Sequence, residues 1–315
     1  MNRIVFLLVP GLHLLDLAGP AQVFSTAADT GLPYGLAYVA DHPAGEPADG
    51  TEGGREDVLT AQGLPLRAPA AWPDLTAADT VLVPGWRWGI RPLHAPPISG
   101  HAARRLAAHH AAGGTVASVC AGAFALAHAG LLDGRRCTTH HQLQDALARR
   151  HPRATVVRDV LYVTDGRVVT SAGIASGIDL ALHMVAARHG PGAAARIART
   201  MVVYARRNGD QPQAGVMLRH RAHLSDAVHR AQDLIDTGYT RPLPLHRLAA
   251  AAGVSERTLT RRFAAATGLT PLRYQQELRL EHAEHLIGQG ATADTAARAV
   301  GFTDARMLRR LRARA

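Results

Sequence analysis

The sequence predicts an α/β domain with a doubly wound, mostly parallel sheet, followed by an all-α domain with tandem helix-turn-helix motifs. Up to about residue 190, short apolar runs that suit buried strands alternate with segments of helical spacing. Beyond a Gly- and Pro-marked stretch the periodicity is helical throughout. The net charge of +10 lies in this second part, because residues 1–190 hold fifteen arginines and fifteen acidic residues, whereas 191–315 hold twenty and ten. Such a basic domain is suited to a polyanion.

The first domain is predicted from strands and helices that alternate along the chain. Residues 3–9 (RIVFLLV) are continuously apolar, as expected of a parallel strand covered on both faces. Further strands are expected at residues 35–40, 79–85, 114–120, 155–157, 160–164 and 167–171. Helices are expected at residues 20–28, 99–112, 122–130 and 176–188, and a polar loop at 41–57. This order is typical of a flavodoxin-like α/β fold.

The domain boundary is expected where helix-breaking residues gather. A chain of 315 residues is long enough for two cores. The segment HGPGAAAR (189–196) is expected to interrupt any helix, and residues 204–213 have the composition of a loop. We therefore expect a first domain over residues 1–190, a linker over 191–215 and a second domain over 216–315.

Cysteine usage and hydropathy exclude several classes of protein. Cys120 and Cys137 are the only cysteines, too few for a disulfide framework or a zinc site, and neither a metal nor a cofactor is expected. Pro10 and Gly11 interrupt the N-terminal apolar run, which is predicted to be a buried strand and not a signal peptide. Since no run of about 18 apolar residues occurs, the protein is expected to be cytoplasmic, with no membrane partner.

A helix-turn-helix motif is predicted at residues 245–271. A short Ala-rich helix ends at Gly253, which tolerates the positive φ of a tight turn. Ser255 is a favoured N-cap for the next helix. On that helix Leu259 and Phe263 are four residues apart and would both face the core.

The opposite face of the same helix is predicted to contact DNA. Arg257, Thr258, Thr260 and Arg261 are the residues assigned to it. Arginines on the second helix of such a motif can reach guanine edges and phosphates. Taken alone, however, the pattern is equally typical of an ordinary helical hairpin.

A second copy of the motif makes DNA binding the favoured interpretation. A shift of 48 residues aligns Gly253 with Gly301 and Leu259 with Met307. The same shift pairs the remaining marks of the motif: Ser255 with Thr303, Glu256 with Asp304, Phe263 with Leu311, and Arg261 with Arg309. The segment AARAVGFTDARMLRRL (296–311) is therefore predicted to be a second helix-turn-helix, with Ala305, Arg306 and Arg309 toward DNA.

A helical spacer is predicted between the two motifs. Residues 271–290 are helical in pattern for about 18 residues, or about 27 Å at the usual rise. A stiff spacer of this order can hold two recognition helices about one DNA turn (~34 Å) apart, in successive major grooves. Double-stranded promoter DNA is thus the expected partner.

These residues resemble the AraC/XylS-type DNA-binding domain over about residues 221–311. The resemblance rests on GLTP (268–271), on the RL-x-x-A pattern of the spacer (279–283) and on GF (301–302). It implies a transcription regulator. The second motif lacks the closing Thr-Gly-Leu-Thr-Pro segment of the first, so we expect it to be the more weakly held of the two.

The first domain has its own candidate site, around Cys120. An apolar strand ends on this cysteine and is followed by small residues and a helix, which is the pattern of a nucleophile elbow. The helix N-terminus is expected to lower the pKa of the thiol. Asp16 follows the first strand, at the carboxyl edge of the sheet where α/β folds bind ligands. A buried structural cysteine and a helix-capping aspartate are the alternative interpretations.

These segments resemble the PfpI-like, class I glutamine amidotransferase-like superfamily, and in particular its GlxA-type regulators with AraC-type domains. The motifs LLDLAGPAQVF, LVPGW, SVCAGAF and VTSAGIASGIDLALHMV carry the resemblance over most of residues 3–190. The resemblance implies that Asp16, Gly85 and Cys120 border a ligand pocket. Ala121 and His140 are assigned to the same pocket.

Catalysis is not expected. PfpI-type hydrolases place a histidine directly after the nucleophilic cysteine, whereas Ala121 stands here. Isonitrile hydratases, which are similar at Asp16 and Cys120, carry a hydroxyl residue at that position. A cysteine-dependent enzyme of the hydratase or amidase kind with an appended DNA-binding module is the alternative, and a redox sensor at Cys120 is a third interpretation.

The function predicted from the sequence is ligand-responsive control of transcription. A small metabolite, nitrogen-containing by analogy with the family, would bind near Asp16 and Cys120 and change how the second domain presents its arginines to DNA. The resemblance also implies a homodimer, and RNA polymerase is a further expected partner.

Overall fold

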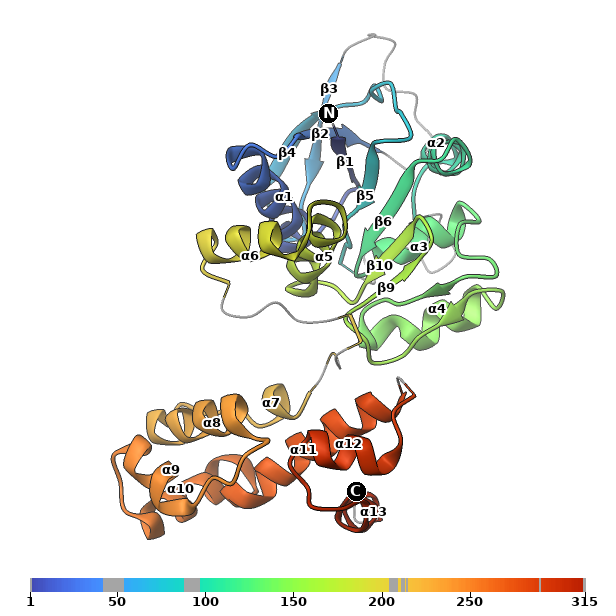
Figure 1. The fold of residues 1–315 in the computed structure, drawn as a ribbon. Coiled ribbons are helices and arrows are strands. Elements are labelled where there is room, and N and C mark those ends of the chain that lie inside the picture. Colours follow the sequence, from blue (N-terminus) through green and yellow to red (C-terminus); the bar gives the residue numbers. More distant parts are fainter. Residues whose placement is uncertain are drawn as a thin grey trace. The chain divides into compact units, whose positions relative to one another are not determined.

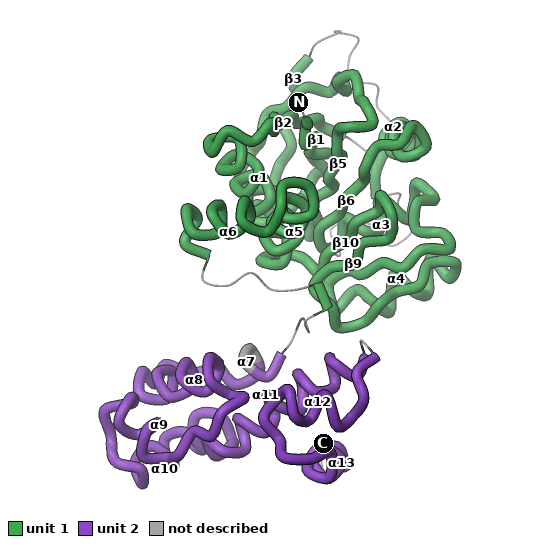
Figure 2. Tube along the Cα trace, in the orientation of Figure 1, with its two compact units in different colours: residues 1–213 green, residues 214–315 purple. Residues whose placement is uncertain are grey.

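The computed structural model describes residues 2–41, 54–87, 97–203, 209–210, 213, 215–288 and 290–313. The chain forms two compact units, residues 1–213 and 214–315 (Figures 1 and 2). The linker expected at 191–215 needs correction, because α6 (Pro191–Thr200) is a helix of the first unit with Ile197 fully buried. Pro191 begins this helix, where its missing N–H costs nothing, so the Gly-Pro pair starts a helix instead of opening a linker.

A six-stranded sheet forms the centre of the first unit, in the order β2-β1-β5-β6-β10-β9. Its strands are β1 (Asn2–Leu8), β2 (Tyr34–Ala40), β5 (Thr80–Val83), β6 (Thr115–Val119), β10 (Val168–Ser171) and β9 (Tyr162–Asp165). All neighbours are parallel except β9, which is antiparallel to β10. The predicted doubly wound sheet is therefore confirmed.

The strand order reverses between β1 and β5, and this topology fixes the position of the candidate site. The chain leaves β1 toward β2 on one side, and β5 lies on the other side of β1. The loops that follow β1 and β5 consequently diverge, and in open α/β sheets ligands bind in the crevice at such a switch point. Asp16 follows β1, Gly85 follows β5, and Cys120 follows the neighbouring strand β6.

Helices cover both faces of the sheet. Helices α1 (Leu14–Asp29), α5 (Ser176–His189) and α6 form one layer, and α2 (Gly100–Ala111) and α3 (Gly122–His128) form the other (Figure 1). One continuous apolar core joins the sheet to both layers. The smaller elements are β3 (Arg55–Leu59), β4 (Pro65–Pro69), β7 (Arg136–Cys137), β8 (Thr155–Val156), the 3-10 helix η1 (His141–Leu143) and α4 (Gln144–Arg150).

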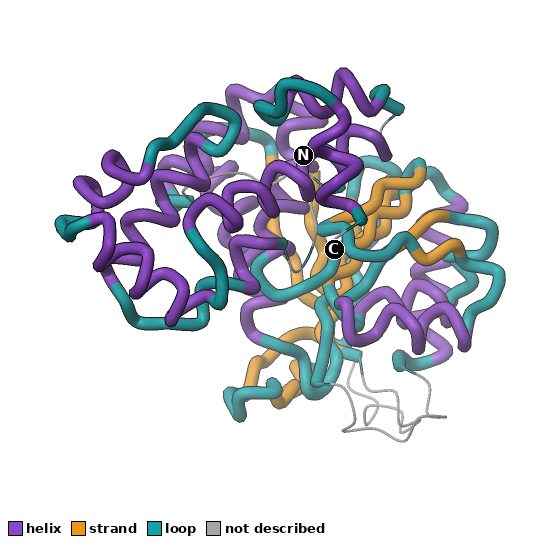
Figure 3. The backbone as a smooth tube through the Cα atoms, turned by 90° about the horizontal axis from the view of Figure 1, so that it is seen from below, coloured by secondary structure: helices purple, strands orange, loops and turns teal. Residues whose placement is uncertain are grey.

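In the second unit, the described residues form helices and loops without strands (Figure 3). The helices are α7 (Val216–Arg219), α8 (Asp226–Gly238), α9 (Leu245–Ala252), α10 (Glu256–Thr267), α11 (Pro271–Gly288), α12 (Ala293–Ala299) and α13 (Ala305–Arg312). They build two separate apolar cores, one around Phe263 and Tyr274 and one around Phe302 and Leu308. Across the described ranges, no helix has the length and apolarity needed to cross a membrane.

Candidate effector site and nucleic-acid interface

Cys120 occupies a tight turn between β6 and α3. Its φ is 55°, in the left-handed region that non-glycine residues seldom adopt. Its N–H donates to the carbonyl oxygen of Ser171 at 3.0 Å, which ties the turn to the end of β10. Residue 122 has to be a glycine, because a Cβ there would lie 3.0 Å from the carbonyl carbon of Val83. The strand–turn–helix geometry expected from the sequence is therefore present.

Asp16 lies against this turn and is fully buried in the first turn of α1. Its Oδ1 accepts the backbone N–H of Ile174 at 2.8 Å. Its Oδ2 forms no hydrogen bond of standard geometry among the described residues, although the Gly85 N–H and the Cys120 thiol lie close enough to the carboxylate to affect its pKa. A buried carboxylate oxygen without a well-aligned donor is costly, so the site presents a strong acceptor that a ligand donor could satisfy better.

Two glycines bring Asp16 and Cys120 together. A Cβ on Gly85 would collide with Asp16 Oδ2 and lie 2.6 Å from the Cβ of Cys120. On the other side, a Cβ on Gly173 would lie 2.9 Å from the Sγ of Cys120. The structure thus places the predicted residues Asp16, Gly85 and Cys120 in one cluster, with Gly173 as a fourth member that the sequence did not single out.

The electrostatics of the cluster contradict one expectation. Burial raises the pKa of the Cys120 thiol to about 12, and the negative charge of Asp16 adds to the effect. Burial likewise raises the pKa of Asp16 to about 6. The expected lowering of the thiol pKa by the helix N-terminus is wrong, because desolvation and a neighbouring carboxylate outweigh a helix of only seven residues. The thiol is protonated at neutral pH.

The two remaining predicted pocket residues, Ala121 and His140, differ in whether the side chain offers a ligand a polar atom. Ala121 is fully buried and offers no polar side-chain atom. His140 is half-buried, and burial lowers the pKa of its imidazole, with further lowering from His141 and His13. Its Nδ1 accepts the N–H of Gln142 at 3.4 Å, a weak bond that leaves the ring largely uncommitted.

His13 is a site residue that the sequence analysis missed. Its backbone N–H donates to the carbonyl oxygen of Gly85 at 2.9 Å, so it lies beside the cluster. Burial lowers the pKa of its imidazole, and Arg87 lowers it further. A positive charge on His13 would also lower the pKa of His140, so the neutral form is favoured for both imidazoles. The feature of the sequence that could have identified His13 is its position directly before the helix that carries Asp16.

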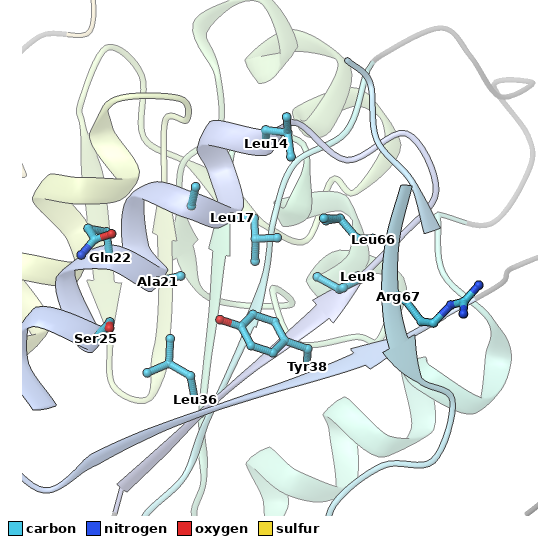
Figure 4. Close-up of a pocket in the computed structure, with 11 residues that line it drawn as sticks. Leu8, Leu14, Leu17, Ala21, Gln22, Ser25, Leu36, Tyr38, Leu66 and Arg67 are labelled. Atoms are coloured by element: carbon cyan, nitrogen blue, oxygen red, sulfur yellow. The ribbon is translucent and has the colours of Figure 1, made fainter. Parts of the chain in front are cut away.

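A separate cavity of about 500 Å³ lies between α1, β2 and β4 (Figure 4). Its walls are mostly apolar and include Leu17, Leu36 and Leu66, with the Tyr38 ring across its middle. Neither Asp16 nor Cys120 is among the residues that line it. The cavity was not predicted, because its walls come from elements far apart in the sequence.

The first helix-turn-helix has the geometry that the sequence predicts. Gly253 is left-handed with a φ of 68°, and Ser255 accepts the N–H of Thr258 as the N-cap of α10. Leu259 and Phe263 are fully buried in the first core. The predicted framework of the motif is therefore confirmed.

The predicted DNA-contacting residues of α10 are not equivalent. Arg257 and Arg261 are exposed and lie one turn apart. Thr258 and Thr260 are half-buried, and their hydroxyl groups bond within the helix: Thr258 to Ser255, and Thr260 to the carbonyl oxygen of Glu256. The arginines are thus the freer recognition groups on this face.

The second motif corrects the predicted alignment. Asp304, not Thr303, caps α13 and accepts the N–H groups of Arg306 and Met307. Leu308 is fully buried where Met307 was expected, so the shift between the motifs is 49 residues after the turn. The second turn is one residue longer, so the 48-residue shift fails at the helix cap and at Leu308, whereas Leu311 is buried like Phe263, its predicted counterpart.

This change of register moves one predicted contact out of reach of DNA. Ala305 is buried in the second core, with an exposed fraction of 4%. Its assignment to the DNA-facing side is therefore wrong, since it begins the buried stripe that continues with Leu308 and Leu311. Arg306 and Arg309 are exposed, and their contact with DNA stays a prediction.

Helix α11 is the predicted spacer and has the predicted length of 18 residues. Tyr274 and Leu278, in its first half, belong to the first core, whereas Ala283 belongs to the second. The same helix therefore contributes to both motifs and makes their separation a fixed property of the unit.

Comparison with known proteins agrees with this two-part organisation. Residues 2–187 match the DJ-1/PfpI family, and residues 248–315 match a helix-turn-helix domain. The chain is 30% identical to the HTH-type transcriptional regulator GlxA of Rhizobium meliloti over 70% of its own length and 60% of that protein's length. It thus spans about 60% of the length of this regulator.

Two further comparisons concern the first unit. Isonitrile hydratase of Pseudomonas putida is 33% identical over 57% of this chain and 69% of that enzyme. The solved structure of a THiJ/PfpI family protein from Pseudomonas syringae has 26% identity and a TM-score of 0.52, covering 68% of this chain and 79% of that one. The chain therefore belongs to the DJ-1/PfpI family and carries an AraC-type helix-turn-helix domain, the architecture of DNA-binding transcription regulators.

Proposed function

We propose that the protein is a transcription regulator whose DNA binding is controlled by a small effector held beside Asp16 and Cys120. The observation that carries the proposal is the Oδ2 of Asp16, which lacks a hydrogen bond of standard geometry and is buried next to a protonated thiol at the switch point of the sheet. The same chain presents exposed arginines on two helix-turn-helix motifs. A site that binds a ligand and a surface that binds DNA are the two parts that such regulation requires.

The chemistry of the cluster indicates which effectors would fit. A donor that meets Asp16 Oδ2 in good geometry would stabilise the buried carboxylate, and an N–H group or a cationic nitrogen supplies the strongest hydrogen bond to it. Such a ligand would also favour the ionised carboxylate and so bring the pKa of Asp16 down from its raised value of about 6. We therefore propose a nitrogen-containing metabolite.

A short chain of hydrogen bonds offers a route from this site to the end of the first unit. Thr139 Oγ1 donates to the carbonyl oxygen of Cys120 at 2.7 Å, and the carbonyl oxygen of Thr139 accepts from Gln213 Nε2 at 2.9 Å. Gln213 is the last residue of the first unit and is also held by Asp159 and Val160. A ligand that displaces the Cys120 turn would disturb this anchorage, directly before the DNA-binding unit begins.

Catalytic turnover is the weaker proposal for the same cluster. The thiolate is the nucleophilic form of cysteine, and a pKa of about 12 leaves very little of it at neutral pH. Ala121 cannot act as a base at the position after the cysteine. The similarity to isonitrile hydratase nevertheless makes hydratase activity the alternative to exclude. We expect Cys120→Ala to retain operator binding, whereas loss of an isonitrile-hydrating activity in that variant would favour the enzyme.

The first experiment is selection of bound sequences from random duplex DNA. Two half-sites about 10 bp apart are expected, one for each motif. The selected operator is then titrated in gel-shift assays with nitrogen-containing metabolites. No sequence preference over bulk competitor, with or without these metabolites, would contradict the proposal. Homodimerisation, contact with RNA polymerase and a cytoplasmic location stay predictions.

The effector site is tested with paired variants of α1. Asp16→Asn should abolish the response of operator binding to the effector, because the amide lacks the charge that binds a cationic nitrogen. Asp29→Asn, at the exposed end of the same helix, should keep the response. An unchanged response in Asp16→Asn would place the effector elsewhere.

The coupling route is tested in the same assay. Gln213→Ala removes the side-chain bonds to Thr139 and Val160, so the effector should still bind while its influence on operator affinity is reduced. Gln142→Ala, an exposed glutamine close to His140, serves as the control and should respond as the wild type does. Isothermal titration reports effector binding independently of DNA. A full response in Gln213→Ala would rule out this route.

A further inference from the structure

The second unit consists of two small subdomains with separate apolar cores. The first core contains Phe263 and Tyr274, and the second contains Phe302 and Leu308. Among the described residues, no fully buried side chain belongs to both cores, and the half-buried ring of Tyr239 packs against each of them. The angle between the two motifs therefore depends on α11, on Tyr239 and on the polar groups that join the subdomains.

Arg279, in the middle of α11, joins them through three backbone carbonyl oxygens. Its Nε donates to Tyr239 at 2.6 Å and its Nη2 to Arg241 at 3.0 Å, both in the loop between α8 and α9. Its Nη1 donates to Gly301 at 2.9 Å, in the turn of the second motif. One planar guanidinium thus binds both subdomains at once, in a single geometry.

Two close contacts surround the same side chain. The guanidinium carbon lies 5.5 Å from the centre of the Phe302 ring, within the range of a cation–π interaction. A Cβ on Gly301, whose φ is 87°, would collide with the carbonyl oxygen of Thr240. The turn of the second motif therefore approaches the first subdomain as closely as backbone atoms allow, and only glycine fits there.

A second residue of α11 strengthens the first side of this junction. Gln275 Nε2 donates to the carbonyl oxygens of Tyr239 and Arg241, at 2.9 and 2.8 Å. The loop between α8 and α9 is thereby fixed on α11 with or without Arg279. The bond from Arg279 to Gly301 is then the one that holds the turn of the second motif to this fixed loop.

We propose that Arg279 is a positioning residue that sets the angle between the two recognition helices and so determines which half-site spacing the protein accepts. It touches no base or phosphate in this role. Its guanidinium fixes the turn of the second motif, and α13, which follows that turn, is fixed with it. Without the guanidinium, the second subdomain would pivot about the C-terminal half of α11 and reach half-sites at several spacings.

The test measures operator affinity as a function of spacing, by fluorescence anisotropy on the full chain. Three duplexes carry the two half-sites at the selected spacing, one base pair closer and one base pair farther apart, and a fourth carries the first half-site alone. Each added base pair rotates a half-site by about 35° around the duplex, so a rigid unit should lose roughly tenfold or more in affinity when the spacing changes.

The variants are Arg279→Ala and Arg279→Lys, with Arg273→Ala as the control on the same helix. Both replacements should reduce the penalty for altered spacing to less than about threefold, since an ammonium group cannot donate along the fixed fork of a guanidinium. Affinity for the isolated half-site should stay within about twofold, because the first core and Gln275 are untouched. The control removes only the pair with Glu277 and should keep the wild-type dependence on spacing.

Arg279→Lys keeps the aliphatic stem and the charge, so it decides the result if the alanine variant does not fold. Wild-type dependence on spacing in the lysine variant would overturn the proposal. Loss of binding to the isolated half-site would also overturn it, because Arg279 would then support the first motif itself. Since these outcomes compare spacings on DNA that the wild type binds, they are independent of whether an effector exists.

Discussion

Asp16 accepts the backbone N–H of Ile174 across 158 positions of sequence, and Ile174 adopts a left-handed conformation with a φ of 49°. Cys120, on the other side of the carboxylate, is also left-handed. Two non-glycine residues in a strained conformation therefore flank one buried carboxylate. Such strain persists where the surrounding structure enforces it, and it often marks sites that change on ligand binding.

The raised pKa of Asp16 predicts a specific pH dependence of stability. The folded state holds this proton more tightly than the unfolded chain does, so the contribution of Asp16 to the free energy of unfolding falls as the pH rises from about 4 to about 6. A rise of the pKa from 3.8 to about 6 corresponds to a loss of about 3 kcal/mol of unfolding free energy over this pH range. Asp16→Asn should remove this loss.

Urea unfolding of both proteins at pH 4, 5, 6 and 7 provides the measurement. The unfolding free energy of Asp16→Asn minus that of the wild type should increase as the pH rises to about 6 and should change little above pH 7. Asp29→Asn controls for the loss of a carboxylate from the same helix. A difference between Asp16→Asn and wild type that stays constant from pH 4 to 7 would show that Asp16 titrates normally.

The Cys120 thiol should resist alkylation and mild oxidation. Its raised pKa and its exposed fraction of 6% predict that the folded protein reacts with iodoacetamide at pH 8 roughly a hundredfold or more slowly than the urea-unfolded chain. Peptide mass spectrometry separates Cys120 from Cys137, whose thiol pKa is raised by burial to about 11. Rapid modification of Cys120 in the folded protein would restore the redox-sensor interpretation, whereas Asp16→Asn should increase its reactivity by removing the adjacent charge.

Gly85→Ala should destabilise the first unit. The added methyl group would collide with Asp16 Oδ2 and with the Cβ of Cys120, and overpacking of this kind costs about 1–3 kcal/mol. Effector binding should be lost as well. Gly192→Ala, in α6 with no atom within 4 Å of the new Cβ, is the matched control and should stabilise the protein by roughly 0.5–1 kcal/mol. Equal melting temperatures for the two variants would contradict the packing described around Asp16.

Arg261→Ala should weaken binding to the selected operator by about 1–3 kcal/mol and relax the preference at the base pair that it reads. Arg262, the next residue, is also exposed but lies about 100° around the helix. Arg262→Ala should therefore weaken specific and bulk DNA binding alike. Gel-shift titration against operator and competitor DNA distinguishes the two. Unchanged operator affinity in Arg261→Ala would show that another face of α10 meets the DNA.

Much of the fold could be predicted from apolar periodicity and turn residues. The run from Arg3 to Val9, the strand that ends at Cys120 and the capped turn at Gly253 each carry a local signal that tertiary packing then reinforces. Helix α6 was missed because a Gly-Pro pair interrupts one helix and starts another, and local composition does not distinguish these cases.

The details of the two sites depend on burial and on single-residue register, which local pattern does not reveal. The rise in the thiol pKa of Cys120 follows from the desolvation of the cluster, and that in turn depends on Gly85 and Gly173, in the loops that follow β5 and β10. The misplaced Ala305 follows from one extra residue in the second turn. Because α13 is rich in arginine, a helix shifted by one residue would still carry arginines on its exposed face. Only the residues on its buried face could have revealed that the second motif is shifted.

The modest size of the second core has a consequence for how the protein engages DNA. Among the described residues it contains eight buried side chains, four of them alanines, whereas the first core contains twelve, with several large ones. Amides of α12 and α13 should accordingly exchange with solvent through subglobal opening at a lower free energy than those of α8 to α10. Association with a duplex would then order this terminal segment, and slower exchange there would be a direct signature of occupancy at the second half-site.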